Sequence, residues 1–249
     1  MKSSGSVLSQ LKFFLRALVD FVFPPVCYGC EQEIEDGLLC DSCRLLLFTS
    51  ELDVCSRCGR PCLPDQKICN SCDQEFNLSR VRAVGIYQTP FINLIHALKY
   101  EEKTALVPIL GNALTLLVRQ DSQLSRADGI CAVPLHPARI GERGYNQSEL
   151  LARYVSASTG IPFFDPLIRK KNTRSQTEMK DEKARQDNVR DAFEIKPGVR
   201  FNGERLILVD DVMTTGSTIS SAAARLRAAG AGEVMGLVLA AVISQKGKA

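Results

Sequence analysis

Four Cys-x-x-Cys pairs near the amino terminus constrain the fold of this chain more than any other feature. The pairs begin at Cys27, Cys40, Cys55 and Cys69, and the last two repeat the first two at closely matched spacing. Two thiolates held two residues apart can bind one ion across a tight turn, and two such turns complete a tetrahedral shell of four sulfurs. A unit this short cannot bury enough apolar surface to fold alone, so metal binding must supply its folding free energy.

We therefore predict two structural zinc sites, each closed by four thiolates with no open position for catalysis. The expected ligands are Cys27, Cys30, Cys40 and Cys43 in the first site, and Cys55, Cys58, Cys69 and Cys72 in the second. Gly29 and Gly59 fit the turns, where a positive φ is often required. Disulfides, a redox centre or an iron–sulfur cluster remain as alternatives. Cys62 is expected to be a non-ligand, and Cys131 a small core residue of an apolar strand.

Composition divides the chain near residue 80. Nine of the ten cysteines come before residue 73, so a Cys-rich head (25–78) precedes an almost Cys-free body (79–245). The 249 residues suffice for one α/β domain and a second, much smaller unit. The net charge of +3, from 31 basic and 28 acidic residues, is too mild to indicate nucleic acid by itself.

An apolar stretch opens the chain, over residues 1–24. Lys12, Arg16 and Asp20 interrupt it, so it is too short for a signal peptide or a membrane span. Its apolar residues recur at helical spacing up to Pro24, which predicts a short amphipathic helix. We expect this helix to pack on its own protein; contact with a membrane surface or a partner is the alternative. A cytoplasmic location follows, where thiols stay reduced.

In the body, continuous apolar strands alternate with amphipathic helices. The expected strands cover residues 81–87, 129–135, 205–211 and 233–243, and the expected helices 90–100, 104–120, 144–159 and 217–230. This alternation predicts an α/β fold, with a parallel sheet covered by helices on both faces. Open sheets of this kind bind ligands beyond the carboxyl ends of their strands.

The stretch LILVDDVMTTGST, residues 206–218, ends one of these strands with Asp210 and Asp211. The hydroxyls and the glycine that follow open a helix, whose amino terminus favours an anion such as a monophosphate. Ionised carboxylates accept hydrogen bonds only, so the pair can hold two ribose hydroxyls. The residues thus predict a ribose 5-phosphate site. A purely structural strand end with a helix cap is the alternative, and no Walker A motif accompanies the acids.

The same stretch closely resembles the 5-phosphoribosyl-1-pyrophosphate (PRPP) signature of type I phosphoribosyltransferases. The whole chain resembles the ComF family, through the paired Cys-x-x-Cys head and three further segments. These are LKY (98–100), VPLHPARIGERGYNQSELLA (133–152) and RSQTEMKDEKARQDNVRDAF (174–193). The resemblance implies a type I phosphoribosyltransferase fold, a parallel sheet flanked by helices, behind a small double zinc ribbon.

By this resemblance, the body holds PRPP together with Mg²⁺. Asp210, Asp211 and Arg143 would form the catalytic group, with the acids on the ribose hydroxyls. The 5-phosphate would be bound by Thr214, Thr215, Gly216, Ser217 and Thr218, and pyrophosphate would face Lys99, Arg139 and Arg143. Guanidinium suits that role because it is always charged and binds phosphate bidentately, although each cation could equally be a surface residue.

The resemblance also implies a flexible loop over residues 169–188 that closes over PRPP, with Gln176, Arg185 and Asn188 as its candidate residues. A solvated or mobile insert is the alternative. Tyr145, Asn146 and Gln147 either cap the next helix or line the site, and His136 is expected to take no part in catalysis.

Three hypotheses of function follow. The first is a phosphoribosyltransferase with an unidentified acceptor, and the second is a PRPP-binding module without transfer. The third draws on the association of ComF proteins with DNA uptake, in which the chain would bind single-stranded DNA or a DNA-translocating helicase. Aromatic residues make up only 6% of the chain and its tyrosines are far apart in sequence, which counts against a single-strand binder. The acceptor and the oligomeric state stay open.

Overall fold

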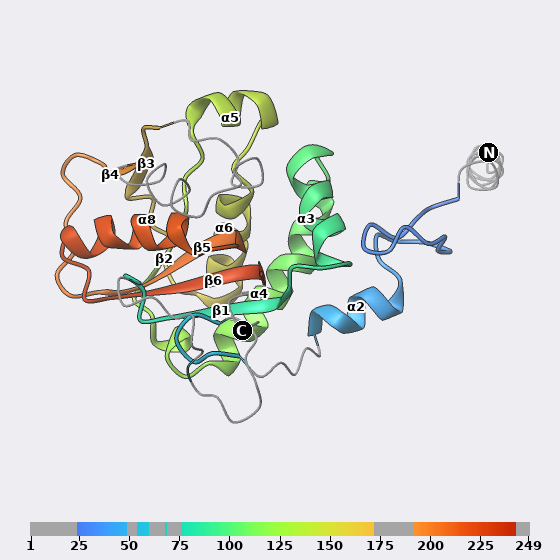
Figure 1. The fold of residues 1–249 in the computed structure, drawn as a ribbon, viewed down its shortest axis with the longest axis horizontal. Coiled ribbons are helices and arrows are strands. Elements are labelled where there is room, and N and C mark those ends of the chain that lie inside the picture. The colour runs from blue at the N-terminus through green and yellow to red at the C-terminus, as the bar shows by residue number, and fades with distance from the viewer. Residues whose placement is uncertain (1–23, 49–53, 60–67, 69–75, 172–191, 243–249) are drawn as a thin grey trace, which may run out of the picture.

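The computed structural model describes residues 24–48, 54–59, 68, 76–171 and 192–242, and all structural statements refer to these (Figure 1). The predicted amino-terminal helix falls on residues 1–23, outside this range. So do the predicted zinc ligands Cys69 and Cys72, together with Cys62. The division of the chain at residues 25 and 79 therefore stays a prediction.

A four-stranded parallel sheet forms the centre of the body, as the alternating pattern predicts. Its order is β1 (Arg80–Ile86), β6 (Glu233–Ala241), β5 (Arg205–Met213) and β2 (Gly129–Ala132). All three neighbouring pairs run parallel. Strands buried on both faces read as unbroken apolar runs, and β6 is buried along nearly its whole length.

Helices cover one face of the sheet, and a helix with a strand pair covers the other. On the first face lie α3 (Phe91–Tyr100), α4 (Val107–Gln120) and α6 (Gln147–Thr159), which share a core with Ile207 and Val209 of β5. On the second lie α8 (Ser217–Ala228) and the antiparallel pair β3 (Leu167–Arg169) and β4 (Phe193–Ile195), packed with Leu206 and Leu208. Alternate residues of β5 thus face opposite layers.

Some elements differ from the sequence prediction. The pattern missed β3, β4 and α5 (Pro137–Arg143), which are three to seven residues long and too short for a clear periodicity. Two 3-10 turns, η1 (Thr104–Leu106) and η2 (Leu124–Arg126), precede α4 and β2. Strand β5 continues past its predicted end, because β6 still pairs with it at Met213, whereas β2 stops opposite Val209.

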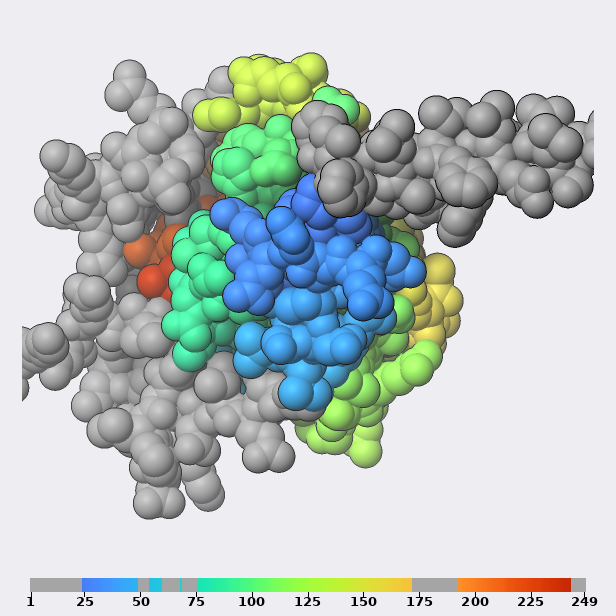
Figure 2. Space-filling view, turned by 90° about the vertical axis from the view of Figure 1, so that its right-hand side faces the viewer, coloured from blue at the N-terminus to red at the C-terminus, as the bar shows by residue number. Residues whose placement is uncertain are grey.

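The first ribbon packs into the core of the body. It contains a bridge between Val26 and Glu33 and the helix α2 (Asp41–Phe48). Cys27, Cys43 and Leu47 are buried in one cluster with residues of α3 and α4. In Figure 2 this segment, in blue, covers the green elements of the body behind it. Folding of the first ribbon and of the body is therefore coupled through shared apolar surface.

The turn of the second ribbon lies against the first strand. Val81 N donates to Arg57 O at 2.7 Å, and Arg82 Nη1 donates to Ser56 O at 3.2 Å. Gly59 has φ +67, and a Cβ there would lie 2.5 Å from Val81 O. The turn thus satisfies part of the exposed edge of β1. Among the described helices, none has the length and apolar character needed to cross a membrane.

Candidate functional site

The two carboxylates lie at the carboxyl end of β5, where the sequence predicts a ligand site. β2 ends opposite Val209, so Asp210 and Asp211 stand just beyond the last pairing on that side. In Figure 1 the arrowheads of β5 and β6 point toward α3. Asp211 is contacted by side chains of α3 and α6, and Asp210 is contacted by Ser148 of α6, with Arg169 of β3 nearby.

Asp211 is buried, with 4% of its surface exposed, and side chains from two helices hold it. Lys99 Nζ of α3 donates to Oδ1 at 2.6 Å, and Gln147 Nε2 of α6 donates to Oδ2. Gln147 Oε1 in turn accepts a hydrogen bond from Arg143 Nη1. A connected polar network thus runs from Lys99 through the carboxylate to the arginine of the predicted pyrophosphate loop.

Asp210 has a different environment. Its Oδ1 accepts from Ser148 Oγ at 3.0 Å and from Asp211 N at 2.9 Å. Burial and the neighbouring Asp211 charge raise its pKa to about 7. Arg169 of β3 lies close enough for its charge to interact with Asp210 and with Arg139, and burial lowers the pKa of Arg169. A carboxyl group that changes charge near neutral pH therefore stands beside cations at the sheet end.

The predicted phosphate loop follows β5 and opens α8. Gly216 is the N-cap of α8 with φ +86, a conformation that side chains rarely adopt. Thr215 Oγ1 and Ser217 Oγ are hydrogen-bonded at 2.9 Å, and Ser217 N donates to Thr215 Oγ1 at 3.3 Å. The turn therefore brings hydroxyls and the positive end of the helix dipole beside the acidic pair.

The predicted pyrophosphate loop forms the short helix α5. Arg139 Nη1 lies 3.4 Å from Glu142 Oε2 on the surface, and the Arg143 guanidinium lies 5.1 Å from the centre of the Tyr100 ring. These side chains border an open pocket of about 120 Å³. It is lined by Lys99, Tyr100, Glu102, Arg139, Glu142 and Arg143. The three predicted cations thus meet around one hollow near Asp211.

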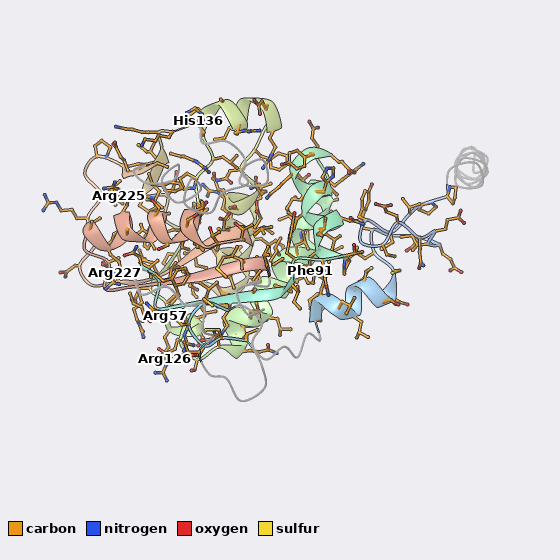
Figure 3. The ribbon with its side chains drawn as sticks, viewed as in Figure 1. Arg57, Phe91, Arg126, His136, Arg225 and Arg227 are labelled. Atoms are coloured by element: carbon orange, nitrogen blue, oxygen red, sulfur yellow. The ribbon has the colours of Figure 1, made fainter. Side chains whose placement is uncertain are left out.

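Of the residues after α5, one caps the next helix and another contacts the acidic pair, which are the two roles that the sequence allows. Asn146 caps α6, because its side chain accepts from Ser148 N, and its amide also donates to Val133 O at 3.0 Å. Gln147 lines the site. His136 caps α5, because its side chain accepts a hydrogen bond from Ala138 N (Figure 3).

Sequence reasoning did not assign a site role to three residues that the structure brings to the site. These are Tyr100, Ser148 and Arg169. Ser148 follows Gln147 at the start of the helix after the predicted pyrophosphate loop, which was the available signal. Arg169 is the first residue of the predicted flexible loop 169–188, but the structure places it at the end of β3, paired with Phe193 of β4, so that start of the loop was wrong. The flexible-loop candidates Gln176, Arg185 and Asn188 lie outside the described residues.

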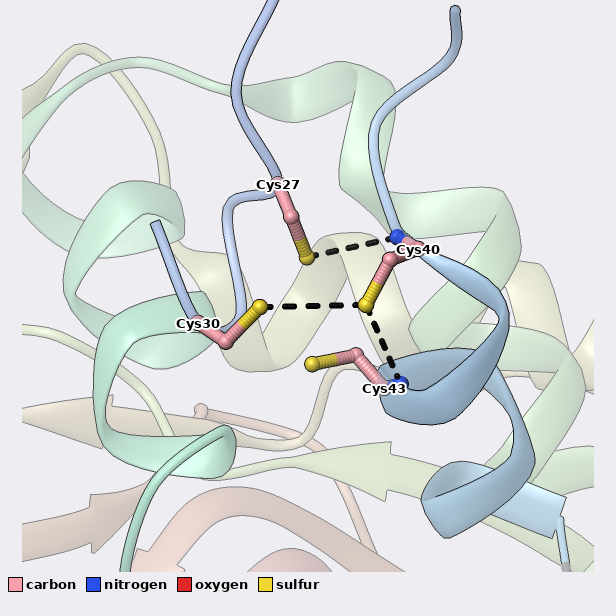
Figure 4. A group of neighbouring side chains, drawn as sticks. All are labelled: Cys27, Cys30, Cys40 and Cys43. Carbon is pink, nitrogen blue, oxygen red and sulfur yellow. Dashed lines mark hydrogen bonds between the residues drawn. The ribbon is translucent and has the colours of Figure 1, made fainter. Parts of the chain in front are cut away.

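The first set of paired cysteines forms a cluster (Figure 4). The sulfur atoms of Cys27, Cys30, Cys40 and Cys43 all lie within 4.8 Å of one another. Four sulfurs at about 2.3 Å from one Zn²⁺ would be about 3.8 Å apart. Cys30 Sγ and Cys40 Sγ are separated by 3.7 Å, so the group fits a tetrahedral zinc ion.

Backbone amides support the thiolate form of Cys27, whereas burial and the neighbouring cysteines raise the pKa of Cys43 in the same cluster. Gly29 N and Cys40 N each donate to Cys27 Sγ at 3.3 Å. Burial would raise the pKa of Cys27, but these amides outweigh it and lower the pKa to about 6. Gly29 does not have the predicted positive φ. The absence of a side chain at Gly29 instead lets the sulfur of Cys43 approach, since a Cβ would lie 2.8 Å from Cys43 Sγ.

Comparisons with known proteins agree with this arrangement. A family described as a double zinc ribbon domain matches residues 18–73, and one described as a phosphoribosyl transferase domain matches residues 94–249. The DNA utilization protein YhgH of Escherichia coli (strain K12) is 29% identical over 217 residues, which cover 85% of this chain and 94% of the relative. Competence protein F of Haemophilus influenzae is 31% identical over 215 residues, covering 84% and 87%.

Solved structures show weaker similarity. The glutamine PRPP amidotransferase of Bacillus subtilis is 26% identical, with 54% of this chain and 26% of that chain covered and a TM-score of 0.37. Adenine phosphoribosyltransferase of Leishmania tarentolae is 17% identical, with 61% and 76% covered and a TM-score of 0.36. The family of this chain is therefore assigned from the sequence matches and from the architecture described above. The chain belongs to the ComF family, in which a double zinc ribbon precedes a phosphoribosyltransferase domain.

Proposed function

We propose that this chain binds PRPP together with Mg²⁺ at the carboxyl end of β5, as the first step of a phosphoribosyl transfer. The observation that carries the proposal is the acidic pair Asp210–Asp211 directly before the Gly216-capped helix. Acceptor-only carboxylates suit ribose hydroxyls, and a helix amino terminus suits the 5-phosphate. Both stand on one short stretch of chain, as the two ends of a ribose 5-phosphate require.

The cations around the pocket suit the pyrophosphate group. Arg139 and Arg143 are permanently charged and can bind phosphate oxygens bidentately. Lys99 lies between the pocket and Asp211, so it can serve both the sugar and the pyrophosphate end. Mg²⁺ would neutralise the charge of the leaving pyrophosphate. The chain's own contribution is to position the sugar and stabilise the leaving group.

Titration calorimetry with PRPP, with and without Mg²⁺, tests this proposal. The wild type should bind in the presence of Mg²⁺, and Asp210→Asn/Asp211→Asn should lose at least tenfold in affinity. Asp165→Asn is the control, since this exposed acid pairs with Lys196 and lies outside the pocket. Equal affinity in the double variant and the wild type would place PRPP elsewhere on the protein. Pyrophosphate release on adding candidate acceptors would extend binding to transfer.

We further propose a role in the uptake or use of DNA, because the relatives are named competence and DNA utilization proteins. One observation favours direct contact with a single strand. Tyr100 is 59% exposed, its ring centre lies 5.1 Å from the Arg143 guanidinium carbon, and its ring packs against the His96 ring at 4.9 Å with a tilt of 47°. An aromatic ring beside cations is the arrangement that binds bases and phosphates of a single strand.

The two activities can be separated by salt and by substitution. Binding of a single-stranded oligonucleotide should fall steeply with salt and should weaken several-fold in Tyr100→Leu. It should survive Asp210→Asn/Asp211→Asn. An affinity that is unchanged in Tyr100→Leu would exclude this surface as the DNA contact. Tyr154→Leu is a suitable control, since that ring bonds Asn112 on another part of the body.

A further inference from the structure

Gln147 links the two halves of the candidate site. It is the first residue of α6, and only 5% of its surface is exposed. Its amide donates to Asp211 Oδ2 on one side and accepts from Arg143 Nη1 on the other. A carboxylate only accepts hydrogen bonds and a guanidinium only donates them. The amide NH₂ must therefore face Asp211 and the amide oxygen must face Arg143, which is the orientation in the structure.

A glutamine suits this position because it is neutral and has both a donor and an acceptor. A glutamate would face Asp211 with a second negative charge, and an apolar side chain would leave the buried carboxylate with fewer partners. The backbone around Gln147 is also fixed. The neighbouring Asn146 caps the helix and donates to Val133 O at the end of β2. The amide is thus held in place at the sheet end.

We propose that Gln147 is a positioning residue that couples the sugar end of the site to its pyrophosphate end. This inference rests on the proposed PRPP site. A sugar whose hydroxyls bind Asp211 fixes the carboxylate, the carboxylate fixes the amide, and the amide fixes the Arg143 guanidinium beside the pocket. The two ends of the ligand therefore support each other through Gln147, in addition to their covalent connection.

The coupling can be measured with the two halves of the ligand as separate probes. Ribose 5-phosphate and pyrophosphate are titrated in Mg²⁺, each alone and each with the other saturating. The ratio of the two affinities is the coupling, and by linkage it is the same in either order of addition. Direct repulsion between the two anions contributes to this ratio in every variant, so variants are compared with the wild type.

Gln147→Met keeps the size of the side chain and removes both hydrogen bonds. We expect its coupling ratio to be less favourable than that of the wild type by about 5- to 10-fold, with a smaller change in the affinity for ribose 5-phosphate alone. Gln147→Glu keeps the acceptor for Arg143 but not the donor to Asp211, and it should lose coupling equally. Gln120→Met, at the exposed end of α4, is the matched control and should keep the wild-type ratio.

Arg143→Met removes the other partner of the Gln147 amide. Because α5 has no buried residues, this substitution should not disturb the core. It should lose coupling to the same extent, and Gln147→Met/Arg143→Met should lose no more than either single variant. A wild-type ratio in Gln147→Met or Arg143→Met would overturn the inference and leave the PRPP site standing. Failure of the wild type to bind either probe would overturn both proposals.

Discussion

Lys99 Nζ and Asp211 Oδ1 lie 2.6 Å apart, although 112 positions separate the two residues in sequence. Burial would lower the pKa of Lys99, but the charge of Asp211 outweighs it and the pKa is raised. The lysine therefore keeps its positive charge, and its hydrogen bond to Asp211 fastens the end of α3 to β5. The same lysine lines the pocket, so one side chain both holds Asp211 and borders the hollow where we propose that pyrophosphate binds.

Removal of Lys99 should destabilise the protein strongly, because Asp211 would keep a buried charge with fewer partners. We expect Lys99→Met to lower the free energy of unfolding by about 3 kcal/mol, measured by urea denaturation. Lys170→Met is the control. Its exposed pair with Glu194 should contribute less than about 1 kcal/mol. If the free energy of unfolding fell by less than about 1 kcal/mol in both variants, the Lys99–Asp211 pair would stabilise the protein no more than an exposed ion pair does.

Asp210 should make stability depend on pH. Its pKa is about 7 in the folded protein and 3.8 as an ordinary value, so the folded state holds the proton more tightly than the unfolded state. As pH rises from 3.8 to about 7, the free energy of unfolding of the wild type should fall relative to that of Asp210→Asn. Above about pH 7 the difference between the two free energies should stay constant. Urea denaturation at pH 5 and pH 8 checks this, and an equal difference at both would contradict it.

PRPP affinity should follow the ionisation of the same carboxyl group. The ionised carboxylate is the stronger acceptor for a ribose hydroxyl, so the affinity of the wild type should rise as pH passes about 7 and then level off. Calorimetry between pH 6 and pH 8.5 measures this, and the rise should be smaller in Asp210→Asn. A parallel rise in both proteins would assign the effect to PRPP itself.

Gly216→Ala should affect ligand binding as well as stability. Gly216 has φ +86, and an added Cβ would lie 2.9 Å from Phe76 Cε2. Gly198 is the matched control, with φ +80 and open space around a Cβ. Both substitutions should cost about 1 kcal/mol of stability through the backbone, but only Gly216→Ala should weaken PRPP binding. Unchanged affinity there would separate the turn from the phosphate site.

Zinc should support both the first ribbon and the body. Cys43→Ser should reduce the zinc content of the protein from two ions per chain to one, measured by mass spectrometry of the metal. It should also lower the melting temperature of the whole protein, because Cys43 and Leu47 share the core of α3 and α4. Cys131→Ser, in the buried strand β2, should keep both ions. Two ions in Cys43→Ser would contradict the assignment.

The sequence predicted the elements whose pattern is long and regular. Continuous apolar strands such as β5 and β6 and the helices around them follow from periodicity, and the order of the sheet confirms the parallel class. The cysteine cluster followed from spacing, because four thiolates at short intervals have few other uses. Asp210, Asp211 and the turn at Gly216 were predicted from local sequence, since they belong to one strand, loop and helix.

Contacts between distant segments could not be read in the same way. The pairing of Lys99 with Asp211 and the bond from Gln147 to the same carboxylate depend on how α3 and α6 pack against the sheet end. Tyr100 and Arg143 seemed unrelated in sequence, yet the fold brings them together. The isolated tyrosines that counted against nucleic-acid binding thus include one beside a cation, which only the tertiary structure reveals.

A crystal structure of the protein with PRPP and Mg²⁺ tests the central claim most directly. The account predicts the 5-phosphate at residues 214–218, the ribose hydroxyls within hydrogen-bond distance of Asp210 and Asp211, and pyrophosphate toward Arg143. A fully occupied ligand bound away from β5, with the Lys99–Asp211 pair and the turn at Gly216 untouched, would contradict it.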